Sequence, residues 1–175
     1  MTREEFNALA LTYLEEITSF AKRLTGNVAD ADDLVQATFE RAFRAWRDLR
    51  DPAACRAWLF RIARNLFVDG RRAAGVRSQL SLASDTETQA EAFVVPMEAV
   101  ERLTARELEA ALARLPREQR EALLLCDLWG FQYTEIAEIV GSPTGTVRSR
   151  IARARGRLSA LLGRTAKGSK ESSKP

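Results

Sequence analysis

Residues 133–162, YTEIAEIVGSPTGTVRSRIARARGRLSALL, read as two helices joined by a tight turn. The first helix is short and ends at Gly141, because glycine readily adopts the positive φ with which many helices terminate. Ser142 can cap the second helix, and Pro143 suits its first position. The stretch therefore predicts a helix-turn-helix.

The second helix of this stretch has two unlike faces. Apolar residues recur at alternating steps of four and three and form one stripe, which consists of Val147, Ile151, Ala154, Leu158 and Leu161. At about 100° per residue, the opposite face carries Gly145, Arg148, Ser149, Ala152, Arg153 and Gly156. Small side chains let a helix enter a DNA groove closely, and arginines reach base edges. Arg150, Arg155 and Arg157 lie on the flanks, where we expect phosphates. A solvated basic helix is the alternative, but the agreement of turn, stripe and arginine face favours DNA binding.

The composition excludes several classes of protein. Of the 175 residues, 46% are hydrophobic and 29% are charged, as in an ordinary folded protein. No apolar run approaches the ~20 residues of a membrane span, and the acidic start MTREEFNALA is unlike a secretory signal, so we expect a cytoplasmic protein without membrane insertion. Histidine is absent, and Cys55 and Cys126 are isolated, which disfavours zinc sites and Ser-His or Cys-His catalysis. We therefore expect no enzyme, cofactor or metal, and interpret both cysteines as small buried thiols.

The charge is distributed unevenly along the chain. Residues 1–75 carry a net charge of +1, residues 76–115 a net charge of −3, and residues 116–175 a net charge of +5. The positive surplus therefore lies in the third of the chain that holds the helix-turn-helix, which favours a polyanionic partner there.

Residues 1–75 predict a compact helical bundle. We expect one amphipathic helix over 3–24, a second from about 30 to 46, and a third from about 54 to 72. Asp51-Pro52 marks a turn before the third helix, because the residue before proline avoids helical angles. Trp58 lies on an apolar stripe, so we interpret it as core rather than as a platform for stacking a base.

Residues 76–104 are rich in Ser, Thr, Gln, Ala and acids and predict a flexible linker, with an apolar patch FVVPM at 93–97 of unassigned role. Helical periodicity returns over 105–162, where Thr104 and Glu107 have capping-box spacing and Pro116 separates two helices. Residues 163–175 predict a disordered basic tail. The expected fold class is all-α: an N-terminal helical bundle and a C-terminal four-helix domain, joined by a flexible linker.

Two segments carry a resemblance to a known family. DADDLVQATFERAFRAW with WLFRIARNLFVDGRR, and LARLPREQREALLLCDLWGFQYTEIAEIVGSPTGTVRSRIARARGRL, resemble the two domains of the extracytoplasmic-function sigma factors of bacterial RNA polymerase. The resemblance implies that residues 1–75 bind core polymerase and melt the promoter, and that residues 105–162 bind the upstream promoter element. It also implies an anti-sigma protein as a partner, because family members are commonly held inactive by one.

The resemblance assigns roles to residues of the N-terminal half. It places the polymerase contact at the start of the second helix, on Asp32, Asp33, Gln36, Thr38 and Phe39. The local alternatives are that Asp32 and Asp33 only serve the helix dipole, or that they bind a metal. The loop at 49–54 and the third helix correspond to the part that captures the downstream element as a single strand, with Arg61, Arg64, Asn65, Arg71 and Arg72 as cations and hydrogen-bond donors.

In the C-terminal half, the family's base-contact positions coincide with the face found from the helical projection. They fall on Arg148, Ser149, Ala152 and Arg153, while Thr144 and Thr146 would contact phosphates. The function expected is an alternative sigma factor that directs core polymerase to specific promoters and helps to melt the DNA. The alternative is a helix-turn-helix transcription regulator with a sensory or partner-binding N-terminal domain. An enzyme is disfavoured, since the sequence has no histidine and no P-loop.

Overall fold

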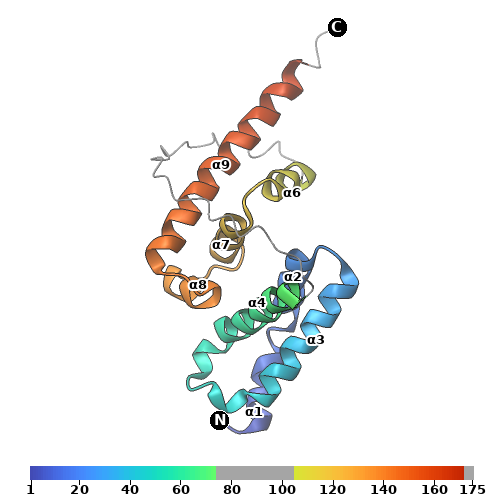
Figure 1. The fold of residues 1–175 in the computed structure, drawn as a ribbon, viewed down its shortest axis with the longest axis vertical. Helices are drawn as coiled ribbons and strands as arrows, with labels where there is room; N and C mark the ends of the chain where they lie inside the picture. Colours follow the sequence, from blue (N-terminus) through green and yellow to red (C-terminus); the bar gives the residue numbers. More distant parts are fainter. Residues whose placement is uncertain (74–104, 172–175) are drawn as a thin grey trace. The chain divides into compact units, whose positions relative to one another are not determined.

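The computed structural model describes residues 1–73 and 105–171, with side chains to Gly163. Every regular element of these residues is a helix, and they divide into two bodies, the first with α1–α4 and the second with α6, α7, most of α8, and α9 (Figure 1). This confirms the all-α fold with two domains. The expected linker, its patch at 93–97 and Thr104 lie outside the described residues. Among the helices of the described part, none is long and apolar enough to cross a membrane.

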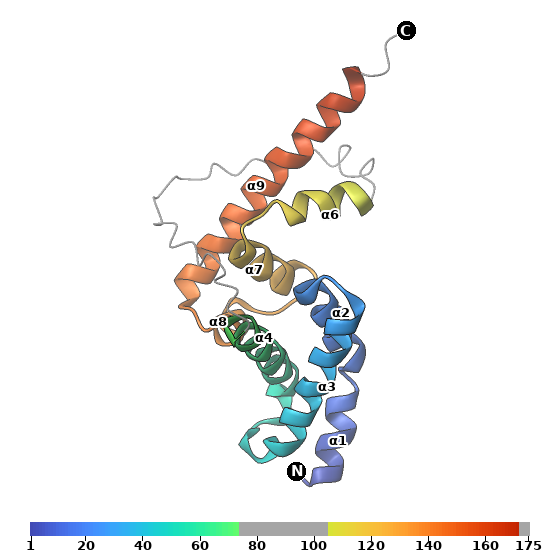
Figure 2. The ribbon, with the colours of Figure 1, turned by 45° about the vertical axis from the view of Figure 1, so that its right-hand side comes forward.

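The N-terminal body is a bundle of four helices. They are α1 (Arg3–Leu11), α2 (Leu14–Thr25), α3 (Val28–Arg44) and α4 (Cys55–Ala73), with short 3-10 turns at Trp46–Asp48 and Pro52–Ala54 between the last two. Helices α2, α3 and α4 pack against one another (Figure 2). Helix α1 contacts α4. The buried core includes Phe6, Ile17, Phe20, Leu59 and Phe60.

Aromatic rings account for much of this core. The ring of Phe20 lies 4.8 Å from that of Phe60, and the ring of Phe6 meets the rings of Phe43 and Trp58 edge-on at 6.0 and 5.9 Å. Such edge-to-face pairs stabilise a core beyond the area that they bury. Trp58 is half-buried and packs inside the bundle, as expected from its place on the apolar stripe.

The expected helix over 3–24 is in fact two helices. The Thr12 hydroxyl donates to the Leu9 carbonyl at 2.7 Å, and the Thr12 and Tyr13 amides donate to carbonyls three residues back. These bonds tighten the chain into a turn and interrupt the α-helical ladder, because a threonine side chain competes with the backbone for its carbonyls.

The next helix begins earlier than expected for a similar local reason. Gly26 closes α2 with a φ of +80°, and the Asn27 side chain then caps α3 by accepting from the Asp30 amide at 2.8 Å. Because Asn27 is the cap, α3 begins at Val28 rather than near Asp30.

The C-terminal body holds α6 (Ala105–Ala113), α7 (Arg117–Asp127), most of α8 (Tyr133–Val140), and α9 (Thr144–Glu171). Both α6 and α7 pack against α9, and the buried residues include Leu115, Leu125, Ile136, Val147 and Ile151. Gly141 has a φ of +62°, which confirms the glycine turn between α8 and α9.

The ends of α9 differ from the sequence expectation. The helix begins at Thr144, so Pro143 precedes it, and the Pro143 carbonyl accepts the first helical bond from the Val147 amide at 3.1 Å. At the other end, α9 continues to Glu171 instead of stopping near 162. The residues expected to form a tail contain no proline up to that point, and each residue added to an existing helix gains one more bond.

Candidate DNA and polymerase interfaces

The inner face of α9 anchors the helix in its domain. Val147, Ile151 and Ala154 are fully buried, as the apolar stripe predicts. Further along, Leu158 and Leu161 are only half-buried, while Ser159 and Leu162 are buried in their place. The expected stripe averages 3.5 residues per turn and a straight helix has 3.6, so the buried face moves on by one residue.

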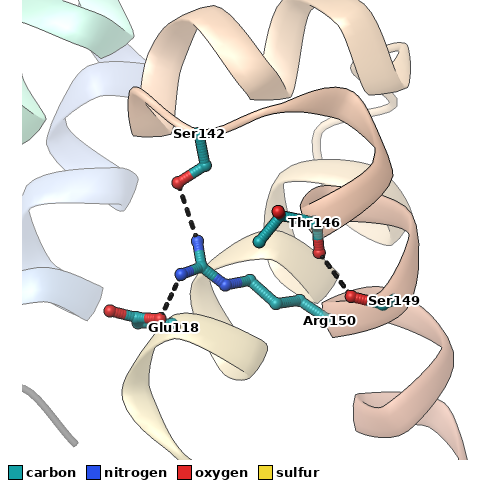
Figure 3. Close-up of polar contacts among 5 residues, drawn as sticks. All are labelled: Glu118, Ser142, Thr146, Ser149 and Arg150. Carbon is teal, nitrogen blue, oxygen red and sulfur yellow. Dashed lines mark hydrogen bonds and ion pairs between the residues drawn. The ribbon is translucent and has the colours of Figure 1, made fainter. Parts of the chain in front are cut away.

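The outer face of α9 is accessible and its residues are small. Gly145, Arg148 and Ala152 are exposed, and Thr144, Thr146, Ser149, Arg153 and Gly156 are half-buried. The Ser149 hydroxyl donates to the Thr146 carbonyl at 2.9 Å, which holds the serine oxygen beside the first turn (Figure 3). Thr144 and Thr146 lie in that first turn, where the helix dipole favours an anion.

The three flanking arginines are bound to α7. Arg150 pairs with Glu118, Arg155 holds Asp127 with bonds of 2.6 and 3.3 Å, and Arg157 donates to the Gln119 amide oxygen at 3.1 Å. The hydrogen bond to Asp127 raises the pKa of Arg155 above its ordinary value. Each of these arginines therefore has an acceptor on α7, and the expectation that they face phosphates stays a prediction.

In α4, the basic residues form an exposed row. Arg61, Asn65 and Arg72 are exposed and follow one another at steps of four and seven, so they share a face of the helix over about 16 Å. Arg64 and Arg71 are half-buried along one edge of this row, and the Arg71 guanidinium lies 5.8 Å from the Phe67 ring centre. The structure thus brings all five residues to one side of α4.

The loop before α4 is held in a defined shape. Leu49 is buried and anchors the loop, while residues 50–54 are exposed. The Asp51 side chain accepts from the Ala53 amide at 2.9 Å and caps the 3-10 turn that leads into α4. Five consecutive exposed residues therefore precede the basic row of α4.

The five residues expected at the polymerase contact separate into two groups. Asp32, Asp33 and Gln36 are exposed on α3, and the Gln36 amide donates to Glu40 at 3.0 Å. Thr38 is completely buried, with its hydroxyl bonded to the Leu34 carbonyl at 2.7 Å, and Phe39 is 7% exposed. Thr38 lies four residues from both Leu34 and Ala42 and so falls on the core stripe. A direct contact through Thr38 is therefore not available, and Phe39 offers little surface.

Two local alternatives for Asp32 and Asp33 are a helix-dipole role and metal binding, and the structure favours neither. Asp30 is the acid in the first turn of α3, and its carboxylate accepts from the side-chain Nδ2 of Asn27 at 2.6 Å. Asp32 and Asp33 come after that turn, where the dipole effect has decayed. Among residues 1–73 and 105–171, no group of three or more Asp, Glu, Cys or His is placed to hold a metal ion.

Sequence reasoning missed the contacts that tie α7 to α9. Glu118, Asp127 and Gln119 are separated from their arginine partners by 32, 28 and 38 residues. No local periodicity links positions so far apart, so the only signal was the presence of acids on the helix that precedes the helix-turn-helix.

Comparison with known proteins assigns both bodies to one family. The family model described as Sigma-70 region 2 matches residues 9–77, and that described as Sigma-70, region 4 matches residues 105–158. The alternative for the N-terminal half of the chain was a sensory or partner-binding domain. The match to Sigma-70 region 2 covers that half.

Individual relatives agree with this assignment. The ECF RNA polymerase sigma factor EcfG of Rhodopseudomonas palustris is 38% identical over 152 residues, which cover 87% of this chain and 82% of EcfG. Among solved structures, the sigma factor RpoE in complex with the anti-sigma factor NepR from Bartonella quintana matches with a TM-score of 0.70 and 33% identity, over 91% of this chain and 98% of that one. CnrH in complex with the cytosolic domain of CnrY matches with a TM-score of 0.63 and 30% identity, over 93% and 90%. The chain therefore belongs to the extracytoplasmic-function sigma factors, the non-enzymatic subunits that direct RNA polymerase to initiate transcription at specific promoters.

Proposed function

We propose that this sigma factor reads the upstream promoter element with the outer face of α9. Arg148 and Arg153 would hydrogen-bond to base edges, with guanine as the favoured partner because it presents two acceptors to a guanidinium fork. The exposed Gly145 and Ala152 would let the helix approach the floor of the groove. Thr144 and Thr146 would contact phosphates at the helix start, and Ser149 would lie beside the bases. The exposure of Arg148 among small residues is the observation that carries this proposal.

The downstream element would be captured on α4. The row Arg61, Asn65 and Arg72, with Arg64 and Arg71 along its edge, provides four cations and an amide on one side of the helix. Single-stranded DNA is bound by such cations along its backbone, together with pockets for unstacked bases. Among the described residues, 50–54 form the exposed loop nearest in sequence to this row. Melting would then be driven by trapping a flipped base, with no ATP consumed.

Core polymerase would bind the exposed part of α3. Asp32, Asp33 and Gln36 offer two carboxylates and an amide on the solvent side, while Thr38 and Phe39 hold the helix in the bundle. A basic surface of the polymerase would complement these acids.

An anti-sigma protein is the expected regulator. RpoE and CnrH, two solved relatives, are in complexes with NepR, an anti-sigma factor, and with the cytosolic domain of CnrY. We infer that this chain works in the cytoplasm and is held inactive there by a protein of the same kind.

The proposal is tested by run-off transcription with purified core polymerase and genomic fragments. Wild-type chain should confer initiation at a defined set of start sites, and the shared upstream sequence of those sites gives the element that α9 reads. Stable association with core polymerase without any choice of start site would refute the proposal.

A further inference from the structure

One arginine of α9 joins three parts of the C-terminal body. The Arg150 guanidinium donates through Nη1 to the Ser142 hydroxyl oxygen at 3.0 Å, and through Nη2 it pairs with a carboxylate oxygen of Glu118 (Figure 3). Ser142 belongs to the turn between α8 and α9, and Glu118 lies in the first turn of α7. A single side chain therefore connects the turn, the supporting helix and the recognition helix.

We propose that Arg150 is a positioning residue, which fixes the orientation of α9 for DNA reading and does not itself contact DNA. This inference rests on the proposed role of the outer face of α9. The Arg150 side chain is 20% exposed, compared with 52% for Arg155, whose pair with Asp127 also joins α9 to α7 but does not reach the turn. The arginine of the Arg150–Glu118 pair is therefore the more enclosed of the two, and it is the one that also bonds to the turn.

The physical reason lies in the precision that base reading demands. Side chains on a helix extend about 5–6 Å from its axis, so a rotation of about 20° about that axis would move the outer face by about 2 Å. Hydrogen bonds to base edges do not tolerate such a shift. Arg150 is two residues from Arg148 and adjacent to Ser149, so it holds the helix at the level where the bases would be read.

A phosphate contact is the competing role for Arg150, and the two roles predict opposite effects of Glu118. Removing an anion from a DNA-binding surface strengthens its attraction to phosphates if charge alone matters. If Glu118 instead anchors the positioning arginine, its removal weakens sequence-specific binding. The two roles also differ in salt dependence, because a lost phosphate contact lowers the salt slope by about one and weakens all sequences equally.

The experiment uses holoenzyme assembled from core polymerase and the full chain. The promoter is one selected with wild-type holoenzyme, and the competitor carries the same sequence with its upstream element scrambled. The ratio of the two affinities is measured over a range of salt concentrations for Glu118→Gln, Arg150→Gln and the double variant. Arg155→Gln is the matched control, since it removes the same charge and a pair to the same helix but leaves the turn untouched.

We expect Glu118→Gln and Arg150→Gln each to lower the specificity ratio about fivefold, which is the upper end of what a partly exposed ion pair contributes. The double variant should be no worse than either single one, because both remove the same interaction. The salt slope should stay at the wild-type value, and Arg155→Gln should keep the wild-type ratio. Tighter binding of Glu118→Gln to both DNAs, with a shallower slope for Arg150→Gln, would overturn the inference.

Two further variants keep the outcome interpretable. Arg148→Ala should lower the specificity ratio in the same assay, and if it does not, the proposed role of α9 fails independently of Arg150. If Arg150→Gln does not fold, as judged by circular dichroism, Glu118→Gln and Ser142→Ala decide the question. Ser142→Ala removes one neutral acceptor and keeps the ion pair, so a reduced ratio at unchanged salt slope supports positioning, and a wild-type ratio for both variants refutes it.

Discussion

Replacing Gly141 by alanine tests the turn of the helix-turn-helix. Gly141 has a φ of +62°, a conformation that costs an L-residue about 1–2 kcal/mol. A Cβ atom built at this position meets no other atom within 4 Å, so steric collision adds nothing to that cost. We therefore expect Gly141→Ala to lower the free energy of unfolding of the C-terminal body by about 1 kcal/mol. Gly141→Asn should cost less, because asparagine tolerates the left-handed region.

The assay is urea unfolding of the full chain followed by fluorescence. Trp129 is 8% exposed and reports on the C-terminal body once Trp46 and Trp58 are replaced by phenylalanine in the background. The urea concentration at the midpoint of unfolding should fall. The slope of the unfolding free energy against urea concentration should stay constant, because the surface exposed on unfolding does not change. A loss of more than about 3 kcal/mol would show a packing cost that the open space around Gly141 does not contain, and equal costs for alanine and asparagine would refute backbone strain as the cause.

The other predictions concern the interfaces and the thiols. Arg153→Ala should reduce promoter-specific transcription and leave polymerase affinity near wild type in a pull-down assay; loss of polymerase binding would contradict the division between the two bodies. Asp33→Ala should weaken polymerase binding, whereas Thr38→Val should not, because that side chain is completely buried. Burial raises the pKa of Cys55 from 9.0 to about 11. The folded state therefore retains the proton that the unfolded state loses, and stability should fall as the pH rises from about 9 to about 11, which urea titrations at these pH values would measure. In the native protein, a maleimide should label Cys126 before the fully buried Cys55, and simultaneous labelling would argue against that burial.

Local chemistry explains what the sequence predicted well. The positive φ at Gly141 and the burial of Val147, Ile151 and Ala154 follow from residue type and helical period, and the structure has both. The two-domain helical fold followed from periodicity and a change in composition at residue 76. These features depend on neighbours within one or two turns of helix, which a single sequence displays.

The sequence was less informative where side-chain hydrogen bonds, or contacts between residues far apart in the chain, determine the structure. The break between α1 and α2 occurs where the Thr12 hydroxyl and the Thr12 and Tyr13 amides bond to carbonyls three residues back, which apolar periodicity does not register. Thr38 was assigned to an interface by resemblance, although its spacing from Leu34 and Ala42 already placed it on the inner stripe. The ion pairs of Arg150 and Arg155 involve acids about thirty residues away, whose proximity is set by the packing of α7 on α9.

The internal pairing of Arg150 and Arg155 has a consequence for the search along the chromosome. Each cation that neutralises a phosphate steepens the slope of log affinity against log salt concentration by about 0.9. When salt is diluted fourfold, a domain with two fewer such cations therefore gains about 12 times less affinity. A domain that keeps Arg150 and Arg155 in these ion pairs would therefore be less retained by arbitrary DNA than its arginine content suggests. Its dwell time on the genome would then depend on the correct sequence and on the attached polymerase.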